Sequence, residues 1–160
     1  MPHDTAALVE ALAAALTARG WMMASAESCT GGLIAGACTD RAGSSDWFER
    51  GFVTYSNQAK TDMLGVSAEL IRDHGAVSEP VARAMAAGAL AHAPVQLAVA
   101  VTGVAGPTGG SADKPVGTVW FGWCVNGSTH SECQRFEGDR GAVRAATVRH
   151  ALAGLLARLT

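Results

Sequence analysis

The chain has 160 residues, a length typical of one domain, and no uncharged apolar run in it approaches the ~18 residues that a membrane helix needs. Hydrophobic residues make up 49% of the sequence and the formal net charge is −2, so neither disorder nor a nucleic-acid-binding surface is expected. Because the first four residues also lack the basic start of a secretory leader, we expect one cytoplasmic domain over residues 1–160, without membrane association.

The first half of the chain alternates helical and strand patterns. Leucines spaced four residues apart predict an amphipathic helix that ends at Gly20, with Asp4 or Thr5 as its cap. Short apolar runs predict strands, and serine or asparagine residues predict the starts of the later helices. The elements expected up to residue 92 are a helix over 4–19, a strand over 21–26, a helix over 33–40, a strand over 48–56, short helices over 57–64 and 67–74, and a long helix over 78–92.

The second half predicts three more strands and a closing helix. A valine-rich run predicts a central strand over 97–102, and Asn126-Gly127 predicts a tight hairpin between strands over 116–125 and 128–136. Asp139 is the expected cap of the last amphipathic helix. This order of elements indicates a three-layer α/β/α sandwich around a mixed sheet of about five strands.

The expected helix over 81–92 is dominated by small side chains, so another backbone can approach it closely. Two interpretations of this face stay open. Packing against the sheet of the same chain is the ordinary use of such a face. An interface between two copies is the alternative, and it makes a homodimer the expected assembly.

A candidate catalytic centre lies where the first strand gives way to a helix. Ser28 falls at this junction, so its hydroxyl is expected at an edge of the sheet. Gly31 and Gly32 open the helix without side chains, which would let a substrate reach backbone N–H groups that carry partial positive charge. Nucleophile and oxyanion donors would then be neighbours. The alternative is that Ser28 or Thr30 only caps the helix.

A serine nucleophile needs a base, and Lys60 is the candidate because none of the five histidines has a suggestive setting. Only a neutral lysine accepts a proton, so its pKa must fall from about 10.4, and burial and a helix N-terminus both lower it. Tyr55, the only tyrosine, could relay the proton or hold the amine. The alternatives are a solvated Lys60 and a Tyr55 that only fills space in the core.

The four cysteines and five histidines show no metal-ligand spacing, so we expect neither a metal nor another cofactor. Cys29 competes with Ser28 as nucleophile, because a thiol is intrinsically more reactive at neutral pH. We predict that Ser28 carries the reaction and that Cys29 is dispensable.

The stretch Gly103–Gly110 could surround a phosphate with backbone N–H groups, as glycine-rich turns after strands do. A mobile loop has the same composition, so this signal is open to both interpretations. Arg140 and Arg144, near the start of the last helix, would add positive charge for a phosphate, although exposed arginines are more often only solvated.

Taken together, several blocks of the sequence resemble the CinA C-terminal domain family, in the family's order and over nearly the whole chain. These blocks are Ala26–Gly32, Tyr55-Ser56-Asn57 with Lys60, Gly75–Ser78, Thr102–Gly110 and Lys114–Val119. The resemblance implies hydrolysis of the carboxamide of nicotinamide mononucleotide to nicotinate mononucleotide and ammonia, a step of pyridine nucleotide salvage without a metal. It assigns the catalytic roles to Ser28, Tyr55 and Lys60.

A small-molecule nucleotide is therefore the expected partner. The residues expected to contact it are Thr30, Gly31, Gly32, Asn57, Thr102, Gly103, Ala105 and Gly106. The alternative is a catalytically silent module of the same fold that binds a nucleotide or another protein. The presence of Ser28, Tyr55 and Lys60 together favours the enzyme.

Overall fold

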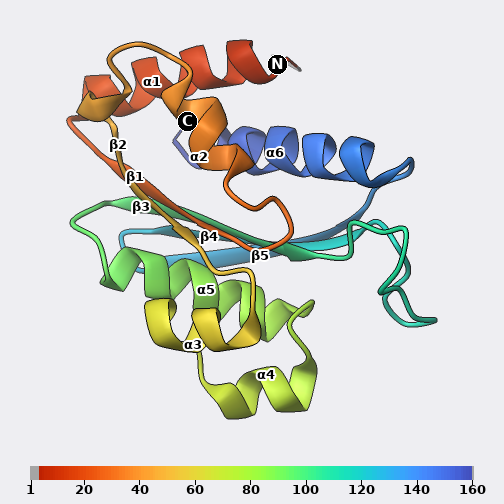
Figure 1. The fold of residues 1–160 in the computed structure, drawn as a ribbon. Helices are drawn as coiled ribbons and strands as arrows, with labels where there is room; N and C mark the ends of the chain where they lie inside the picture. The colour runs from red at the N-terminus through yellow and green to blue at the C-terminus, as the bar shows by residue number, and fades with distance from the viewer. Residues whose placement is uncertain (1–3, 160) are drawn as a thin grey trace.

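The centre of the molecule is a five-stranded mixed sheet, seen in a computed structural model that describes residues 4–159. Residues 1–3, which carry the expectation about a secretory leader, lie outside this range. The strands are β1 (Met23–Glu27), β2 (Phe48–Val53), β3 (Leu97–Gly103), β4 (Thr118–Val125) and β5 (Ser128–Arg135). Their order is β2-β1-β3-β4-β5, with β1 parallel to β2 and β3, and with β4 antiparallel to β3 and β5 (Figure 1). The predicted mixed sheet is confirmed.

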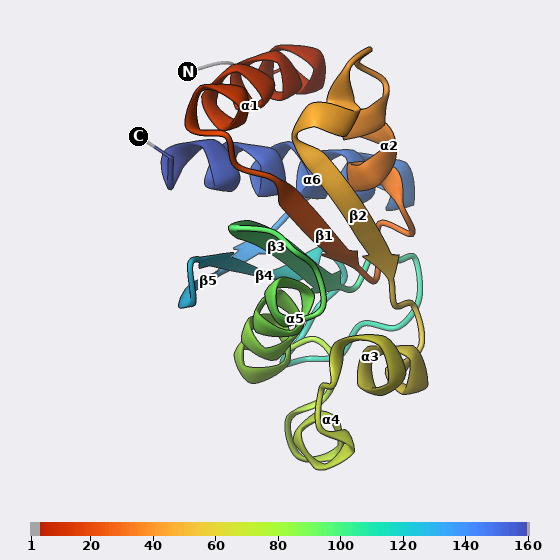
Figure 2. The same ribbon diagram turned by 90° about the vertical axis from the view of Figure 1, so that its left-hand side faces the viewer.

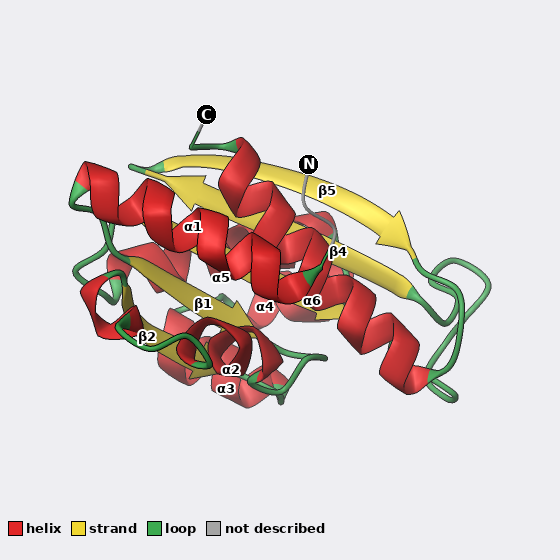
Figure 3. Cartoon of the chain, turned by 90° about the horizontal axis from the view of Figure 1, so that it is seen from above, coloured by secondary structure: helices red, strands yellow, loops and turns green. Residues whose placement is uncertain are grey.

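Helices cover both faces of the sheet, so the predicted three-layer sandwich is also confirmed (Figures 1 and 2). One face carries α1 (Thr5–Arg19), α2 (Leu33–Thr39) and α6 (Arg140–Ala157), and the other carries α3 (Asn57–Leu64), α4 (Ala68–His74) and α5 (Glu79–Ala91). Figure 3 shows α1 and α6 side by side across their face. Within residues 4–159, no helix has the length and apolarity that crossing a membrane requires.

The predicted capping residues occupy the starts of their helices. Asp4, Ser56, Ser67 and Asp139 each accept a hydrogen bond from a backbone N–H in the first turn of the helix that follows. At the Asn126-Gly127 hairpin, φ is 50° and 91°, respectively, in the left-handed region that a two-residue turn of this kind requires. Local sequence signals therefore set most element boundaries.

The small-residue face of α5 is used within the chain. Its buried residues are Val81, Ala82, Met85, Ala86, Gly88 and Ala89. A Cβ at Gly122 of β4 would lie 2.5 Å from the carbonyl oxygen of Ala82, so the helix backbone almost touches the strand. The intramolecular interpretation of this face is confirmed. Because this face is buried within the chain, it no longer supports the predicted homodimer, which stays a prediction.

The three parallel strands end at the same edge of the sheet. Glu27 at the end of β1 pairs with Val53 of β2 on one side and with Val101 of β3 on the other. The loops that follow these strands therefore emerge side by side, and ligands of open α/β sheets collect at such an edge. These loops hold Ser28, Tyr55 and the glycine-rich stretch.

Candidate active site

A serine and a buried lysine meet at this edge. Ser28 follows β1 directly, and Lys60 lies in the first turn of α3. Lys60 Nζ lies 3.0 Å from Ser28 Oγ, and the two residues are only 1% and 8% exposed. The interpretation of Lys60 as a solvated helix residue is therefore wrong. A hydroxyl and an amine at this separation can exchange a proton directly.

The other neighbours of the Lys60 amine are backbone carbonyls. Nζ lies 3.0 Å from the oxygen of Thr54, 3.2 Å from that of Tyr55 and 3.4 Å from that of Ser56. Burial lowers the pKa of Lys60 below its ordinary value, because the charged ammonium loses its hydration, and the nearby Cys29 opposes part of this effect. In the part of the chain that the structure describes, no carboxylate pairs with this amine.

The turn after Ser28 is held by a buried carboxylate. Glu27 Oε1 accepts hydrogen bonds from Thr30 Oγ1 at 2.5 Å and from the Ile34 N–H at 2.9 Å, and Oε2 accepts from the Ala35 N–H at 3.0 Å. Glu27 thus satisfies the first N–H groups of α2, where the sequence suggested Ser28 or Thr30 as the cap. The Ser28 hydroxyl takes no part in this cap: it accepts from Lys60 Nζ at 3.0 Å and donates to the Tyr55 carbonyl at 3.4 Å.

Gly31 and Gly32 complete the turn with φ values of 56° and 108°, in the region that favours glycine. The Gly31 N–H donates to the Ser28 carbonyl at 3.1 Å. The N–H groups of Thr30 and Gly32 make no hydrogen bond to any other described residue. On the far side of the turn, Arg144 of α6 donates to the carbonyls of Cys29 and Thr30, each at 3.1 Å.

Tyr55 occupies a different place from the one expected. Its carbonyl accepts from Lys60, but its side chain is 60% exposed and its hydroxyl accepts from Arg140 Nη2 at 3.1 Å. Arg140 Nη1 also donates to the Gly106 carbonyl at 2.8 Å, so this arginine joins Tyr55 to the glycine-rich loop. The expected hydrogen bond between the phenol and the amine is absent among the described contacts, and the interpretation of Tyr55 as a core residue is wrong as well.

A cavity of about 360 Å³ opens in front of Ser28. Its walls come from the ends of the three parallel strands and from the start of α6. They consist of Ser28, Cys29, Tyr55, Val77, Gly103, Val104, Ala105, Gly106, Thr108, Gly109 and Arg140. The predicted glycine-rich residues Gly103, Ala105 and Gly106 thus share a cavity with Ser28. Arg140, suggested as positive charge for a phosphate, also lies on this wall, and Val77 comes from the Gly75–Ser78 block, for which no role in the site was predicted.

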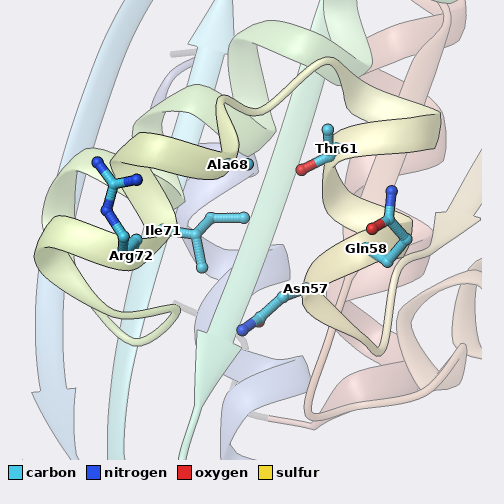
Figure 4. A pocket seen from close by; sticks show the side chains of 6 residues that line it. All are labelled: Asn57, Gln58, Thr61, Ala68, Ile71 and Arg72. Carbon is cyan, nitrogen blue, oxygen red and sulfur yellow. The ribbon is translucent and has the colours of Figure 1, made fainter.

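Some expected binding residues lie elsewhere. Thr102 is buried and its hydroxyl donates to the Ala76 carbonyl at 3.0 Å. Asn57 lines a separate cavity of about 220 Å³ between α3 and α4. Figure 4 shows its side chain there, with Gln58 and Thr61 from the same helix and Ala68, Ile71 and Arg72 from α4. Thr30, Gly31 and Gly32 form the turn behind the cavity and are not among the residues of its wall.

Cys29 faces the same cavity but is a poor nucleophile there. Burial raises the pKa of its thiol to about 11, so the thiol stays protonated at neutral pH. Ser28, by contrast, has a base at hydrogen-bonding distance. Among residues 4–159, no three His, Cys, Asp or Glu side chains come together in an arrangement that could hold a metal ion.

Comparison with known proteins gives consistent matches over nearly the whole chain. The family described as the CinA C-terminal domain matches residues 5–159. The nicotinamide-nucleotide amidohydrolase PncC of Enterobacter agglomerans is 59% identical over 134 residues, which cover 83% of this chain and 82% of that protein. The protein of the same name from Escherichia coli K12 is 55% identical over 148 residues, 91% of this chain and 88% of that one.

Solved structures match equally well. The crystal structure of the competence/damage inducible protein CihA from Agrobacterium tumefaciens has a TM-score of 0.94 and 50% sequence identity, and the match covers 98% of this chain and 96% of that one. The similarity therefore extends to the complete arrangement of helices and strands, including the edge of the sheet where Ser28 and Lys60 meet.

Proposed function

Because this chain belongs to the CinA C-terminal domain family, we propose that it is an amidohydrolase that converts nicotinamide mononucleotide to nicotinate mononucleotide and ammonia. The names of two relatives support the substrate, since the proteins from Enterobacter agglomerans and Escherichia coli K12, at 59% and 55% identity, are called nicotinamide-nucleotide amidohydrolases. The observation that carries the proposal is the 3.0 Å separation between Lys60 Nζ and Ser28 Oγ in a buried setting. The reaction would serve cytoplasmic salvage of pyridine nucleotides.

The reaction begins at the serine hydroxyl. Lys60, in its neutral form, takes the proton of Ser28 while Ser28 Oγ forms a bond to the carboxamide carbon. The carbonyl oxygen becomes an oxyanion, which backbone N–H groups of the turn after Ser28 stabilise. Lys60 then gives its proton to the departing nitrogen, the carbon–nitrogen bond breaks, and ammonia leaves an ester on Ser28.

A water molecule then hydrolyses the ester, and Lys60 again acts first as base and then as acid. Lys60 takes a proton from water as the hydroxide forms its bond to the ester carbon, and it returns the proton to Ser28 Oγ as the ester bond breaks. The product is the carboxylate of nicotinate mononucleotide. No step requires Tyr55 as a proton carrier, so we assign to Tyr55 the carbonyl that orients Lys60 and a phenol at the mouth of the cavity.

The remainder of the nucleotide would lie along the glycine-rich loop. Gly103, Ala105 and Gly106 line the cavity, and glycine residues allow a ligand to approach the backbone closely. Arg140, on the same wall, offers positive charge to a phosphate. Thr102 and Asn57 have no direct contact in this proposal, because their side chains lie elsewhere.

A coupled ammonia assay tests the proposal. We expect the wild-type chain to release ammonia from nicotinamide mononucleotide and the Ser28→Ala variant to release none above background. Binding of the nucleotide without release by the wild type would favour the silent binding module instead. Release by both proteins at the same rate would show that Ser28 is not the nucleophile.

A further inference from the structure

Arg144 reaches from α6 to the turn that carries the nucleophile. Its Nε donates to the Cys29 carbonyl and its Nη2 donates to the Thr30 carbonyl, each at 3.1 Å, across more than a hundred residues of sequence. The turn fits closely around this side chain, since a Cβ at Gly31 would lie 3.4 Å from Nη2. Neither donor is directed at a carboxylate, so the guanidinium bonds to the backbone of this turn alone among the described residues.

These two contacts orient two successive peptide groups: Arg144 alone holds the Cys29 carbonyl, and it shares the Thr30 carbonyl with the Leu33 N–H, which donates to it at 3.0 Å. A trans peptide is planar, so its N–H points opposite to its carbonyl. With the carbonyls of Cys29 and Thr30 turned towards α6, the N–H groups of Thr30 and Gly31 point away from it. The Gly31 N–H already donates to the Ser28 carbonyl and closes the turn. A reversed peptide would instead aim a carbonyl oxygen at the developing oxyanion and repel it.

We propose that Arg144 is a positioning residue for the amidohydrolase reaction, which holds the Cys29 and Thr30 carbonyls away from the reacting group so that the Thr30 N–H, which has no partner among the described residues, stays available to the oxyanion. This inference rests on the proposed function for its substrate. Arg144 acts through the backbone, because it is not among the residues that line the cavity. Its charge also polarises the two peptide groups, which strengthens their N–H groups as donors.

The residue type matters for this role. A guanidinium places two donors in a fixed plane and can bond two neighbouring carbonyls at once, whereas a lysine ammonium is a single point of charge. Arg144→Lys therefore keeps the charge and the aliphatic part of the side chain but loses one of the two carbonyl contacts. Arg149, exposed on the same helix, is the matched control because no contact between described residues ties it to the site.

The experiment measures kcat and KM for ammonia release, together with the rate at which a fluorophosphonate labels Ser28. In the labelling reaction the Ser28 oxygen–phosphorus bond forms, fluoride leaves and Lys60 takes the proton, while the phosphoryl oxygen occupies the oxyanion position. The labelling rate therefore depends on how well the turn stabilises the phosphoryl oxygen, and its interpretation needs no assumption about the natural substrate. Thermal unfolding of each variant is recorded at the same time, so that loss of fold is distinguished from loss of rate.

We expect Arg144→Lys and Arg144→Ala to lower kcat by about tenfold or more, with KM within about twofold of wild type and a parallel fall in labelling rate. Added guanidinium ion should partly restore the Arg144→Ala variant, and Arg149→Ala should match wild type throughout. Unchanged kcat and labelling in a folded Arg144→Lys variant would overturn the proposal. A rise in KM alone would also overturn it, because that result identifies a substrate contact.

The two proposals fail in distinguishable ways. If wild type is labelled but releases no ammonia from nicotinamide mononucleotide, the proposed substrate is wrong and the labelling rates still decide the role of Arg144. If Arg144→Ala does not fold, Arg144→Lys gives the decision, since it preserves most of the packing.

Discussion

The amine of Lys60 has four neighbours that accept hydrogen bonds, and only Ser28 can also donate one. Three of the four are carbonyl oxygens at 3.0–3.4 Å, which have no hydrogen to give. A neutral amine has two N–H groups and one lone pair. In the structure Ser28 Oγ accepts from Lys60 Nζ at 3.0 Å and donates to the Tyr55 carbonyl at 3.4 Å. When the N–H groups of a neutral Lys60 bond to the other carbonyls, its lone pair can take the Ser28 proton after rotation of the hydroxyl. The site therefore holds the base within reach of the nucleophile before any substrate binds.

The pH dependence of catalysis follows from this arrangement. Only neutral Lys60 accepts the proton, so the active fraction rises with pH through the pKa of Lys60. Burial lowers that pKa, which moves the rising limb of kcat/KM to lower pH than free lysine, at about 10.4, would give. We expect kcat/KM to rise and level off below that value, and Lys60→Ala to lose activity at every pH tested.

Lys114 provides the control for this measurement. Its amine donates to the His74 carbonyl at 2.8 Å, away from Ser28, so Lys114→Ala should keep the same rising limb. A profile that is flat from about pH 6 to about pH 10, or a limb at the pKa of free lysine, would remove Lys60 from the role of base.

The choice between the two neighbouring nucleophiles is a second test at this scale. The Cys29 thiol is protonated at neutral pH because burial raises its pKa to about 11, whereas Ser28 has its base in place. We expect Ser28→Ala to lower kcat/KM by about a thousandfold or more, and Cys29→Ala to keep most of the activity. Rapid quenching and mass spectrometry should find the acyl group on Ser28. The opposite order of effects would assign the reaction to the thiol.

The sequence predicted the pair of Ser28 and Lys60 and the glycine-rich wall of the cavity, but not the contacts that Arg140 and Arg144 make around it. Ser28 and Lys60 both lie close to the ends of parallel strands, and those strand ends were recognisable from local patterns. The contacts of Arg140 and Arg144 join residues that lie 34 to 115 positions apart. Such contacts depend on where α6 packs, which local patterns do not specify.

At the scale of elements, α2 depends on a side chain from the preceding strand. Three donors face the Glu27 carboxylate: the Thr30 hydroxyl and the N–H groups of Ile34 and Ala35. The sequence predicted the caps of α1, α3, α4 and α6 because each cap directly precedes its helix. Glu27 lies six residues before Leu33, outside the window in which capping patterns apply, so the prediction fell on Ser28 or Thr30 instead.

Glu27→Gln tests this capping role. The amide retains one acceptor oxygen but turns an NH₂ group towards a donor, which leaves at least one buried group without a partner. We expect the free energy of unfolding to fall by about 1–3 kcal/mol, measured by urea denaturation. Glu10→Gln, which alters an exposed carboxylate, should leave the unfolding midpoint unchanged. Equal midpoints for Glu27→Gln and wild type would mean that α2 does not need this carboxylate.

At the scale of the whole molecule, the sequence predicted the three layers better than it predicted which strands lie next to one another in the sheet. The Asn126-Gly127 turn predicted that β4 and β5 pair as a hairpin, and the alternation of helices and strands predicted a mixed sheet. The position of β1 between β2 and β3 is a non-local result, set by which faces can be buried together. The homodimer was inferred from a helix face that the sheet already covers. Light scattering in solution would measure the assembly directly.

The sheet joins two hydrophobic clusters that share the same strands. Leu97, Val99 and Val101 of β3 belong to the cluster beneath α1 and α6, while Ala98 and Ala100 belong to the cluster beneath α5. Loss of packing on one face therefore loosens strands on which the other face depends. We propose that the described chain unfolds as one cooperative unit.

Met85→Ala tests this coupling between the two faces. Met85 is fully buried on the α5 side, whereas three of the four tryptophans, Trp21, Trp47 and Trp123, lie in or against the cluster on the opposite side. Trp120 alternates with Phe121 along β4 and therefore points to the α5 side, so the test uses a Trp120→Phe background. We expect a loss of about 2–5 kcal/mol, seen as the same shift in tryptophan fluorescence and in far-ultraviolet circular dichroism. Met63→Ala, at an exposed position of α3, should shift neither signal. Separate transitions for the two signals would mean that the helices of one face unfold while the other face keeps its packing.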